Sequence, residues 1–317
     1  TCIITMRDIW ELYHSHFPKN IDVYFVHTLE EGELNKEIDK FNNYKMIIGF
    51  GGGQALDIAK YFSWKCRLTL FQFPTSISVD AVFGHRSGIR RKGNVNYIGW
   101  AIPESVFIDY EIIQSAPSIY NYSGIGDVLC FYTGVLDWQL ANKKNKCEKK
   151  WSYNQELAMQ SLKYVDDLLI NVDDIKTMNE KGIDTIIRAH QWGGNSFFSS
   201  GWNPRHIEGI EHFFFYNLEF LTNKKFIHGQ PVCLGFVIGC LLHNKLQDKF
   251  LKFFKSLNFD FTPSAMNLSW DNIDTTLSSL KNYIEKNQLW YGIGNEFQYS
   301  KEIIDQLKDT LNFIYKI

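Results

Sequence analysis

The first third of the chain alternates short apolar runs with stretches in which apolar residues recur at helical spacing. Four runs predict strands, and two of the stretches between them predict helices. The run at 45–50 is apolar throughout, which is typical of a strand covered on both faces. Strands that alternate with helices in this way predict a parallel sheet of βα units. The predicted strands are 22–27, 45–50, 67–73 and 105–108, and the predicted helices are 30–41 and 54–64.

The pattern changes near residue 117, where strand signals fade and long helical periodicities begin. This change predicts an α/β domain over 1–118, followed by an all-α domain over 119–317. We expect an active site in the cleft between two such domains. The predicted helices of the second domain are 123–142, 154–171, 183–199, 209–221, 231–246, 272–286 and 301–315.

Three consecutive glycines, Gly51, Gly52 and Gly53, connect a predicted buried strand to the helix that carries Asp57 and Lys60. A glycine turn in that setting lets the backbone approach a phosphate closely, and the helix N-terminus supplies N–H groups and a positive dipole end. The spacing differs from the usual dinucleotide fingerprint G-x-G-x-x-G. An ordinary strand-to-helix turn therefore explains the glycines equally well on their own.

A second polar segment follows the strand that Pro74 ends, and it contains Thr75, Ser78 and Asp80. Open α/β sheets bind ligands at the carboxyl ends of their strands, which is where this segment lies. The two hydroxyls and the carboxylate could contact a cofactor or the hydroxyls of a substrate. The alternative is a loop stabilised by proline, serine and an Asx-type turn.

Three residues of the helical half, Asp127, His212 and His228, are candidate metal ligands. Each has a plain structural explanation alone, since Asp127 suits a helix N-terminus and the histidines flank buried helices. Together they offer one carboxylate and two imidazoles, a set that suits Zn²⁺, and also Fe²⁺ or Mn²⁺. Three protein ligands leave one position open for a substrate oxygen, as a catalytic site requires.

Five motifs in this order resemble those of the dehydroquinate synthase-like superfamily, on the side of the iron-containing alcohol dehydrogenases and glycerol dehydrogenases. The stretch 124–141 (GIGDVLCFYTGVLDWQLA) is most similar to sn-glycerol-1-phosphate dehydrogenases. The resemblance covers nearly the whole chain. The motifs are the GGGxxxDxAK pattern at 51–60, the segment 74–80, the segment 124–127, Glu211-His212 and His228-Gly229.

The resemblance implies a Rossmann-like domain that binds NAD or NADP, a helical domain that binds one divalent metal, and a homo-oligomer. It implies hydride transfer between the alcohol and ketone forms of a small polyol, polyol phosphate or sugar phosphate. By position, it assigns Asp127, His212 and His228 to the metal, and Gly51, Gly52, Gly53, Asp57, Thr75 and Ser78 to the cofactor. It assigns Asp80 to a substrate hydroxyl, and we expect Arg205, with His206 or Arg90, to hold a phosphate or carboxylate.

The chain departs from the glycerol-1-phosphate dehydrogenase pattern SRPxSGxEHxxSH around the first metal histidine. The arginine is kept as Arg205, but small residues become Ile207 and Glu208, and the later Ser-His becomes Phe215-Tyr216. These residues form a wall that helps to shape the substrate pocket. We therefore expect this pocket to differ from that of the glycerol-1-phosphate dehydrogenases. The predicted strand 22–27 ends at His27 without the acid that selects NAD, which leaves NAD and NADP both open.

Charge and composition exclude several classes of partner. Lys and Arg total 33 against 35 Asp and Glu, so a formal net charge of −2 offers no case for nucleic acid or an anionic membrane. No apolar run approaches the ~20 residues that span a bilayer, and the longest, 232–242, predicts a buried helix.

The six cysteines form no Cys-x-x-Cys pair, which favours free thiols in a reducing cytoplasm. The basic cluster Arg86, Arg90, Arg91 and Lys92 could face a phosphate, although a solvated turn is the commoner case.

Three other functions are compatible with parts of this pattern. A redox-neutral sugar-phosphate lyase or cyclase of the dehydroquinate synthase type would use NAD⁺ catalytically, but it needs more basic residues around a phosphate. A silent NAD-binding protein would not need all three candidate ligands. A non-haem iron oxygenase uses the same two-histidine, one-carboxylate set but leaves the glycine turn unexplained.

Overall fold

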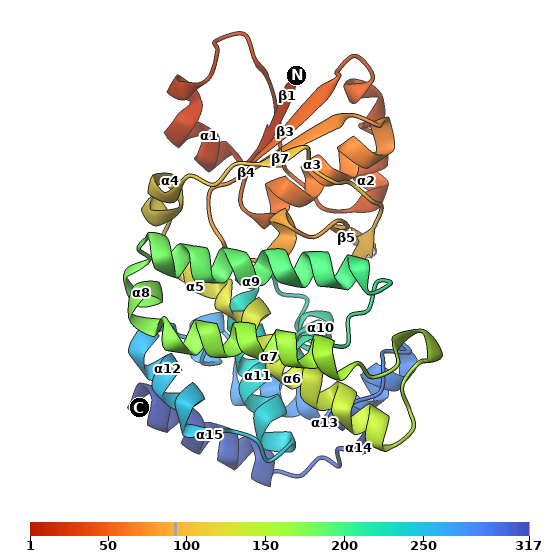
Figure 1. Cartoon of the computed structure of the whole chain (residues 1–317), viewed down its shortest axis with the longest axis vertical. Helices are drawn as coiled ribbons and strands as arrows, with labels where there is room; N and C mark the ends of the chain where they lie inside the picture. Colours follow the sequence, from red (N-terminus) through yellow and green to blue (C-terminus); the bar gives the residue numbers. More distant parts are fainter. Residues whose placement is uncertain (92–93, 317) are drawn as a thin grey trace. The chain divides into compact units, whose positions relative to one another are not determined.

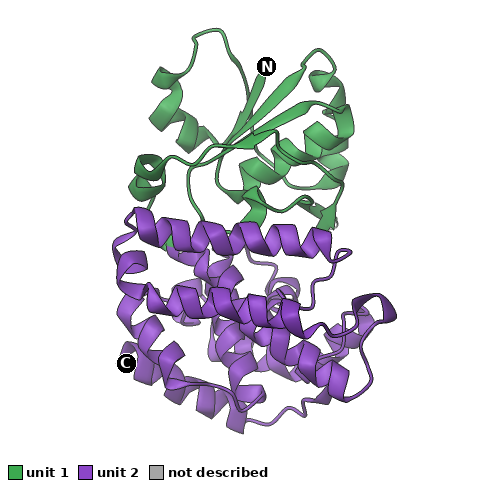
Figure 2. Cartoon of the chain, viewed as in Figure 1, with its two compact units in different colours: residues 1–121 green, residues 122–317 purple. Residues whose placement is uncertain are grey.

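The computed structural model describes residues 1–91 and 94–316. The chain divides into two compact units, residues 1–121 and residues 122–317, which we call unit 1 and unit 2 (Figure 2). Each of the six cysteines, all of them within the described part, is a free thiol. Among residues 1–91 and 94–316, no helix is both long and apolar enough to cross a membrane.

Unit 1 is built on a five-stranded sheet with the order β2-β1-β3-β4-β7, and every pairing is parallel (Figure 1). The predicted parallel sheet is therefore confirmed. One of its strands, β1, precedes the first strand that the sequence pattern predicted. The strands are β1 (Cys2–Thr5), β2 (Asp22–Phe25), β3 (Met46–Gly51), β4 (Thr69–Pro74) and β7 (Ser105–Val106).

Helices cover both faces of this sheet (Figure 1). On one face, α3 (Gly53–Cys66) packs so closely that a Cβ on Gly49 of β3 would lie 2.8 Å from the Cβ of Ala59. On the other face, the rings of Tyr13, at the end of α1 (Arg7–Tyr13), and of Phe17 meet Phe50 edge-on. The central strand is thus buried on both faces, as its apolar sequence predicts.

Two parts of unit 1 differ from the predicted elements. The stretch 30–41 forms α2 (Glu31–Asn35) and the short 3-10 helix η2 (Ile38–Phe41) instead of one helix, because its hydrogen bonds shift to the tighter spacing of three residues. Two residues of the basic cluster, Arg90 and Arg91, lie in β5 (Ser87–Arg91), which pairs antiparallel with β6 (Asn94–Ile98), and Arg86 directly precedes β5. Lys92 of that cluster lies outside the described residues. The other short elements are η1 (His14–His16), η3 (Asp80–Val82), α4 (Tyr110–Ser115) and α5 (Ser118–Ser123).

Unit 2 is helical, and each helix predicted for it is found within a few residues of its predicted bounds. The pattern did not predict α8, α12 and α14. Its elements are α6 (Ile125–Lys143), η4 (Lys149–Trp151), α7 (Gln155–Ile170), α8 (Val172–Thr177), α9 (Glu180–Ser199), α10 (Ile210–Thr222), α11 (Gly229–Leu242), α12 (Asp248–Leu257), η5 (Ser264–Met266), α13 (Trp270–Lys286), α14 (Ile293–Glu296) and α15 (Glu302–Tyr315).

The core of unit 2 forms around α11, which packs against α6, α10 and α15. Every residue from Gly229 to Cys240 is buried, so this helix is apolar on all sides, as expected from the run at 232–242. Glycines let its neighbours approach, since a Cβ on Gly235 would lie 2.6 Å from the carbonyl oxygen of Glu211 on α10. The close packing of α6, α10 and α11 brings the starts of these helices together.

Candidate active site

Asp127, His212 and His228 lie at the N-terminal ends of the three central helices of unit 2. Asp127 belongs to the first turn of α6, His212 to the first turn of α10, and His228 caps α11. A helix N-terminus carries a partial positive charge, which favours the carboxylate of Asp127 at this position. The three residues come from helices that the chain connects over long distances but that pack directly on one another.

The ligand atoms of these three side chains gather at one place. Nε2 of His228 lies 2.9 Å from Oδ1 of Asp127, and Nε2 of His212 lies 3.7 Å from the same oxygen. All three ligand atoms lie within 4.8 Å of one another. Asp127 and His212 are 7% and 6% exposed, while His228 is half-buried. The structure thus brings together the three residues predicted as ligands, and metal binding itself stays a prediction.

Glycine at position 229 is required for this convergence. A Cβ on Gly229 would lie 2.1 Å from the carbonyl oxygen of Ser123, a distance that no side chain tolerates. The Gly229 N–H also donates to the Ser123 hydroxyl at 2.7 Å, which ties the start of α11 to the residues before α6. A Cβ on Gly126 would lie 3.2 Å from the Cα of Gly229. The two Gly-containing motifs therefore hold Asp127 and His228 side by side.

Glu211 contacts the Nδ1 side of the His212 ring, and it is fully buried. Its Oε1 lies 3.0 Å from Nδ1 of His212 and accepts the Gly209 N–H at 2.7 Å, while its Oε2 accepts the Thr133 hydroxyl at 2.6 Å. A carboxylate only accepts, so Nδ1 carries the proton and Nε2 is left to face Asp127. This carboxylate–histidine arrangement is common behind metal ligands. The sequence motif Glu211-His212 did not predict this role for Glu211, although its position next to His212 was a usable signal.

The charges of the cluster shift the pKa values of Asp127 and His212 so that the ionised form of each is favoured. Burial alone would raise the pKa of Asp127, but His228, His212 and His190 hold it well below its usual range. Burial alone would lower the pKa of His212, but the carboxylates of Glu208, Glu211 and Asp127 raise it to about 9. The site is therefore charged in the metal-free protein, and a proton on His212 competes with a metal.

The donor chemistry fits a divalent metal. One carboxylate oxygen and two imidazole nitrogens suit Zn²⁺, and also Fe²⁺ or Mn²⁺, with an open position for a substrate oxygen. The negative charges of Asp127 and Glu211 offset the positive ends of the helices, which would otherwise oppose a cation. A second set of possible donors, Cys130, Glu211 and His212, overlaps the first, and its ligand atoms also lie within 4.8 Å of one another.

The structure does not bring Arg205 and His206 into this cluster as oxyanion-binding groups. The Arg205 side chain is fully buried, and it donates to the carbonyl oxygen of Tyr291 at 2.7 Å and lies 3.8 Å from the carboxylate of Glu148. His206 is also fully buried, with Nε2 2.8 Å from the Ser196 hydroxyl. Burial lowers the pKa of His206 to about 3. Both contribute to packing within unit 2, and these contacts do not support the role predicted for them.

In unit 1, the two candidate cofactor segments meet at adjacent strand ends. Gly51 ends β3 beside Pro74, which ends β4, and the Thr75 N–H donates to the Gly51 carbonyl at 3.0 Å. The strand order changes direction between β1 and β3, and open α/β sheets bind ligands at such a switch point. A Cβ on Gly51 would lie 4.0 Å from the hydroxyl of Thr5, which ends β1. The glycine turn thus lies at the position where this topology binds a nucleotide.

The glycines of the turn are needed for backbone geometry and for close packing. Gly51 has φ of +151°, and a Cβ on it would lie 2.9 Å from the Cβ of Ala55. A Cβ on Gly53 would lie 2.5 Å from Cγ2 of Val79. Gly52 caps α3 without a side chain of its own, so the helix start is bare backbone. That arrangement fits the phosphates of a dinucleotide, which bind to backbone N–H groups at a helix start.

Asp57 and Lys60 fasten the segment that carries Asp80. Nζ of the buried Lys60 lies 2.8 Å from Oδ1 of Asp57 and donates to the carbonyl oxygens of Ala81 and Gly84 at 2.8 and 3.0 Å. Asp80 begins η3, directly before this anchor, and Ser78 precedes it. Asp57 therefore has a structural role in holding this loop, and its predicted cofactor contact stays a prediction.

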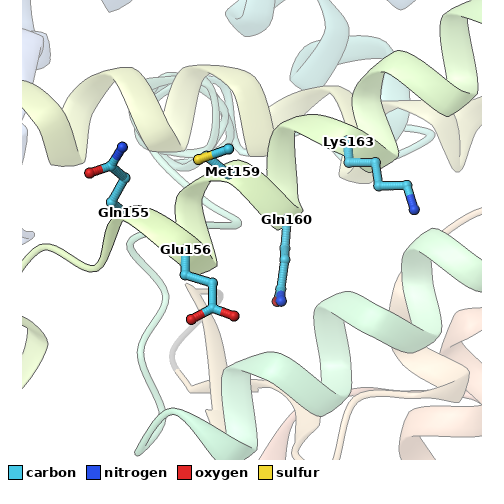
Figure 3. Close-up of a pocket in the computed structure, with 5 residues that line it drawn as sticks. All are labelled: Gln155, Glu156, Met159, Gln160 and Lys163. Carbon is cyan, nitrogen blue, oxygen red and sulfur yellow. The ribbon is translucent and has the colours of Figure 1, made fainter.

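A hollow on α7 is lined by none of the residues of these two clusters (Figure 3). All of its lining residues come from one face of this single helix, and their side chains do not converge on a common point. A site for chemistry needs groups from several elements around one position. We assign no function to this hollow, which is lined by Gln155, Glu156, Met159, Gln160 and Lys163.

Residues 10–117 match the family model described as iron-containing alcohol dehydrogenase. The chain is also 32% identical over 216 residues to a glycerol-1-phosphate dehydrogenase [NAD(P)+] of Thermococcus kodakarensis, which is 68% of this chain and 60% of that protein. Residues 10–117 thus match the iron-containing alcohol dehydrogenase family. Both comparisons agree with the resemblance that the motifs predict.

Solved structures share the fold of this chain. A probable glycerol dehydrogenase from Sinorhizobium meliloti superposes with a TM-score of 0.71 at 15% identity, over 100% of this chain and 91% of that one. The 2-epi-5-epi-valiolone synthase of Streptomyces hygroscopicus, solved with NAD⁺ and Zn²⁺ bound, has a TM-score of 0.66 at 15% identity, over 98% of this chain and 90% of that one. At such identities these neighbours establish the fold, an α/β Rossmann-like part followed by a helical part.

Proposed function

We propose that the chain is a metal-dependent, NAD(P)-linked dehydrogenase that interconverts the alcohol and ketone forms of a polyol or polyol phosphate. The observation that carries this proposal is the convergence of Asp127, His212 and His228 from three helix starts. Structural roles explain each residue alone, but they do not explain why two imidazoles and a carboxylate share one partly open place.

Two groups supply the reaction's chemistry when bound: a divalent metal acts as a Lewis acid on the carbinol oxygen, and a nicotinamide cofactor carries the hydride. The residues of the chain bind and orient. Asp127, His212 and His228 hold the metal, Glu211 fixes the ring of His212, and the bare helix start at Gly52 and Gly53 binds the cofactor phosphates. In this proposal, Thr75 and Ser78 contact the cofactor, and Asp80 accepts a hydrogen bond from a second substrate hydroxyl.

The named relatives support this activity. The Thermococcus protein and several others of similar identity are glycerol-1-phosphate dehydrogenases [NAD(P)+]. The chain spans about 60% of the length of the curated relatives that it matches. The whole activity, its substrate and its partners are for that reason part of the proposal. We further propose a homo-oligomer in a reducing cytoplasm, which the six free thiols suit.

The experiment is metal binding and turnover of His228→Ala. The variant should lose stoichiometric binding of Zn²⁺ and metal-dependent oxidation of NADH or NADPH, and circular dichroism should show an intact fold. His243→Ala is the control, because His243 lies at the other end of α11 and pairs with Asp137 at 2.9 Å. This control should keep the metal. Metal-dependent turnover by His228→Ala would show that the ligand assignment is wrong.

The same assay separates the dehydrogenase from the redox-neutral alternative. A dehydrogenase consumes one reduced nicotinamide for each ketone reduced, and a lyase or cyclase returns the nicotinamide to its starting state in every cycle. Conversion of a sugar phosphate without net loss of NADH or NADPH would therefore favour the lyase. Tight cofactor binding without any reaction would favour a silent NAD-binding protein.

A further inference from the structure

Two departures from the family pattern, Glu208 and Tyr216, contact each other. They replace a serine and a histidine of that pattern, and they are eight positions apart in the sequence. In the structure the Tyr216 hydroxyl donates to Oε1 of Glu208 at 2.8 Å. A new carboxylate and a new donor that pair directly form one local feature, which we call the Glu208–Tyr216 pair.

The Glu208–Tyr216 pair lies beside the metal centre. Tyr216 follows His212 by one turn of α10, and the centroids of the two rings lie 5.9 Å apart. The backbone of Glu208 is fixed against α6, because a Cβ on Gly134 would lie 2.9 Å from its nitrogen. Both members of the pair are half-buried, whereas Gly209 and Glu211 between them are buried. The pair is therefore part of the accessible wall next to His212.

The carboxylate of Glu208 accepts the hydrogen bond of the Tyr216 hydroxyl, one turn of α10 from the predicted metal ligand His212. The cation expected to bind a phosphate, Arg205, points its guanidinium at the carbonyl of Tyr291 and at Glu148. This chain has thus gained a carboxylate beside His212, and its expected phosphate-binding arginine is engaged in the interior.

We propose that the Glu208–Tyr216 pair determines substrate specificity, selecting an unphosphorylated polyol over a polyol phosphate. This inference rests on the proposed function and narrows its substrate class. A carboxylate accepts hydrogen bonds and donates none, so it suits the hydroxyl groups of a polyol. A phosphate brought beside it would meet a like charge, which weakens binding strongly where water is excluded. The hydroxyl of Tyr216 holds the carboxylate in the position where it acts.

The test compares dihydroxyacetone with dihydroxyacetone phosphate as oxidants of NADH or NADPH by the Zn²⁺-loaded full chain. The wild type should have the higher kcat/KM for dihydroxyacetone. Glu208→Gln keeps the shape and removes the charge, and it should shift the ratio toward the phosphate by about tenfold or more. Tyr216→Phe should shift it less, because the charge remains. Glu156→Gln, on the exposed face of α7, is the matched control and should leave the ratio unchanged.

Two results would overturn the proposal while the dehydrogenase assignment stands. They are a wild type that prefers the phosphate, and an unchanged ratio in Glu208→Gln. If neither ketone is consumed, the proposed function fails, and binding decides the inference instead. The visible spectrum of the Co²⁺-loaded chain would then be titrated with glycerol and with glycerol 1-phosphate. Tighter binding of the phosphate would overturn the inference, and tighter binding of glycerol that is lost in Glu208→Gln would support it.

Discussion

Glu211 influences the metal centre through His212, whose Nδ1 lies 3.0 Å from its carboxylate. Replacing Glu211 with Gln removes the charge and leaves the side chain's shape, so we predict a loss of Zn²⁺ affinity of roughly 10–100-fold. Competition with a chelating indicator measures this affinity. Glu219→Gln is the matched control, because Glu219 lies two turns further along α10. Equal affinities in the Glu211 variant and the wild type would show that Glu211 does not support the ligand.

The protonation of His212 predicts how metal affinity depends on pH. Neighbouring carboxylates raise the pKa of His212 to about 9 in the metal-free protein, so below that pH a metal must displace a proton from the ring. The apparent affinity for Zn²⁺ should therefore rise as the pH increases from about 6.5 to 9, and then level off. Isothermal titration across this range, with correction for buffer protonation, measures the trend. An affinity that stays constant between pH 7 and 9 would contradict it.

At the same scale, the sequence predicted the type of the metal ligands better than the roles of their neighbours. Asp127, His212 and His228 could be proposed because their side chains suit a metal and their motifs occur in a known order. The burial of Arg205 could not be foreseen, because it depends on Tyr291 and Glu148, which lie far from it in the sequence. A guanidinium suits both a phosphate and a buried ion pair.

At the scale of elements, Asp137 of α6 connects the starts of two other helices. Its Oδ2 accepts the N–H of Ile210 at 2.8 Å, at the start of α10, and its Oδ1 accepts that of Ile293 at 2.7 Å, at the start of α14. His243 lies 2.9 Å from the same Oδ1. Because α10 carries His212, this buried carboxylate also fixes the helix that presents a metal ligand.

Replacing Asp137 with Asn should lower the free energy of unfolding by about 2–5 kcal/mol, because the amide places a donor among buried donors. Urea titration followed by circular dichroism measures the change. Asp166→Asn is the control, since its carboxylate pairs with Lys249 on the surface and its side chain is 56% exposed; little effect is expected there. A loss below 1 kcal/mol in Asp137→Asn would show that α10 and α14 are held by packing alone.

Long periodic helices were predictable, and short elements were not. The pattern placed α7 and α15 within one residue at each end, because each has a clear apolar face. It missed α12, although Phe250, Phe253, Phe254 and Leu257 follow helical spacing over its ten residues. It also missed the strand pair β5–β6, whose residues are mixed in polarity and whose pairing depends on register rather than on composition.

At the scale of the whole molecule, the change of pattern near residue 117 indicated two kinds of architecture, and the parallel sheet and the helical part are both found. The family could be recognised because its motifs lie at the ends of strands and helices, where the backbone itself restricts the residue type. Gly51 and Gly229 are such positions, since their packing or backbone excludes a side chain. The substrate could not be inferred from the sequence alone, because the wall beside His212 departs from the family pattern at Glu208 and Tyr216.

The most direct test of the account is the absorbance of NADH and of NADPH with the Zn²⁺-loaded chain and dihydroxyacetone or its phosphate. A metal-dependent dehydrogenase should cause loss of the reduced-nicotinamide signal, equal in amount to the ketone consumed, and no loss after the metal is removed by a chelator. Restoring Zn²⁺ should restore the reaction in the wild type and not in His228→Ala. A reaction that continues at the same rate without metal, or no reaction with either ketone, would contradict the account.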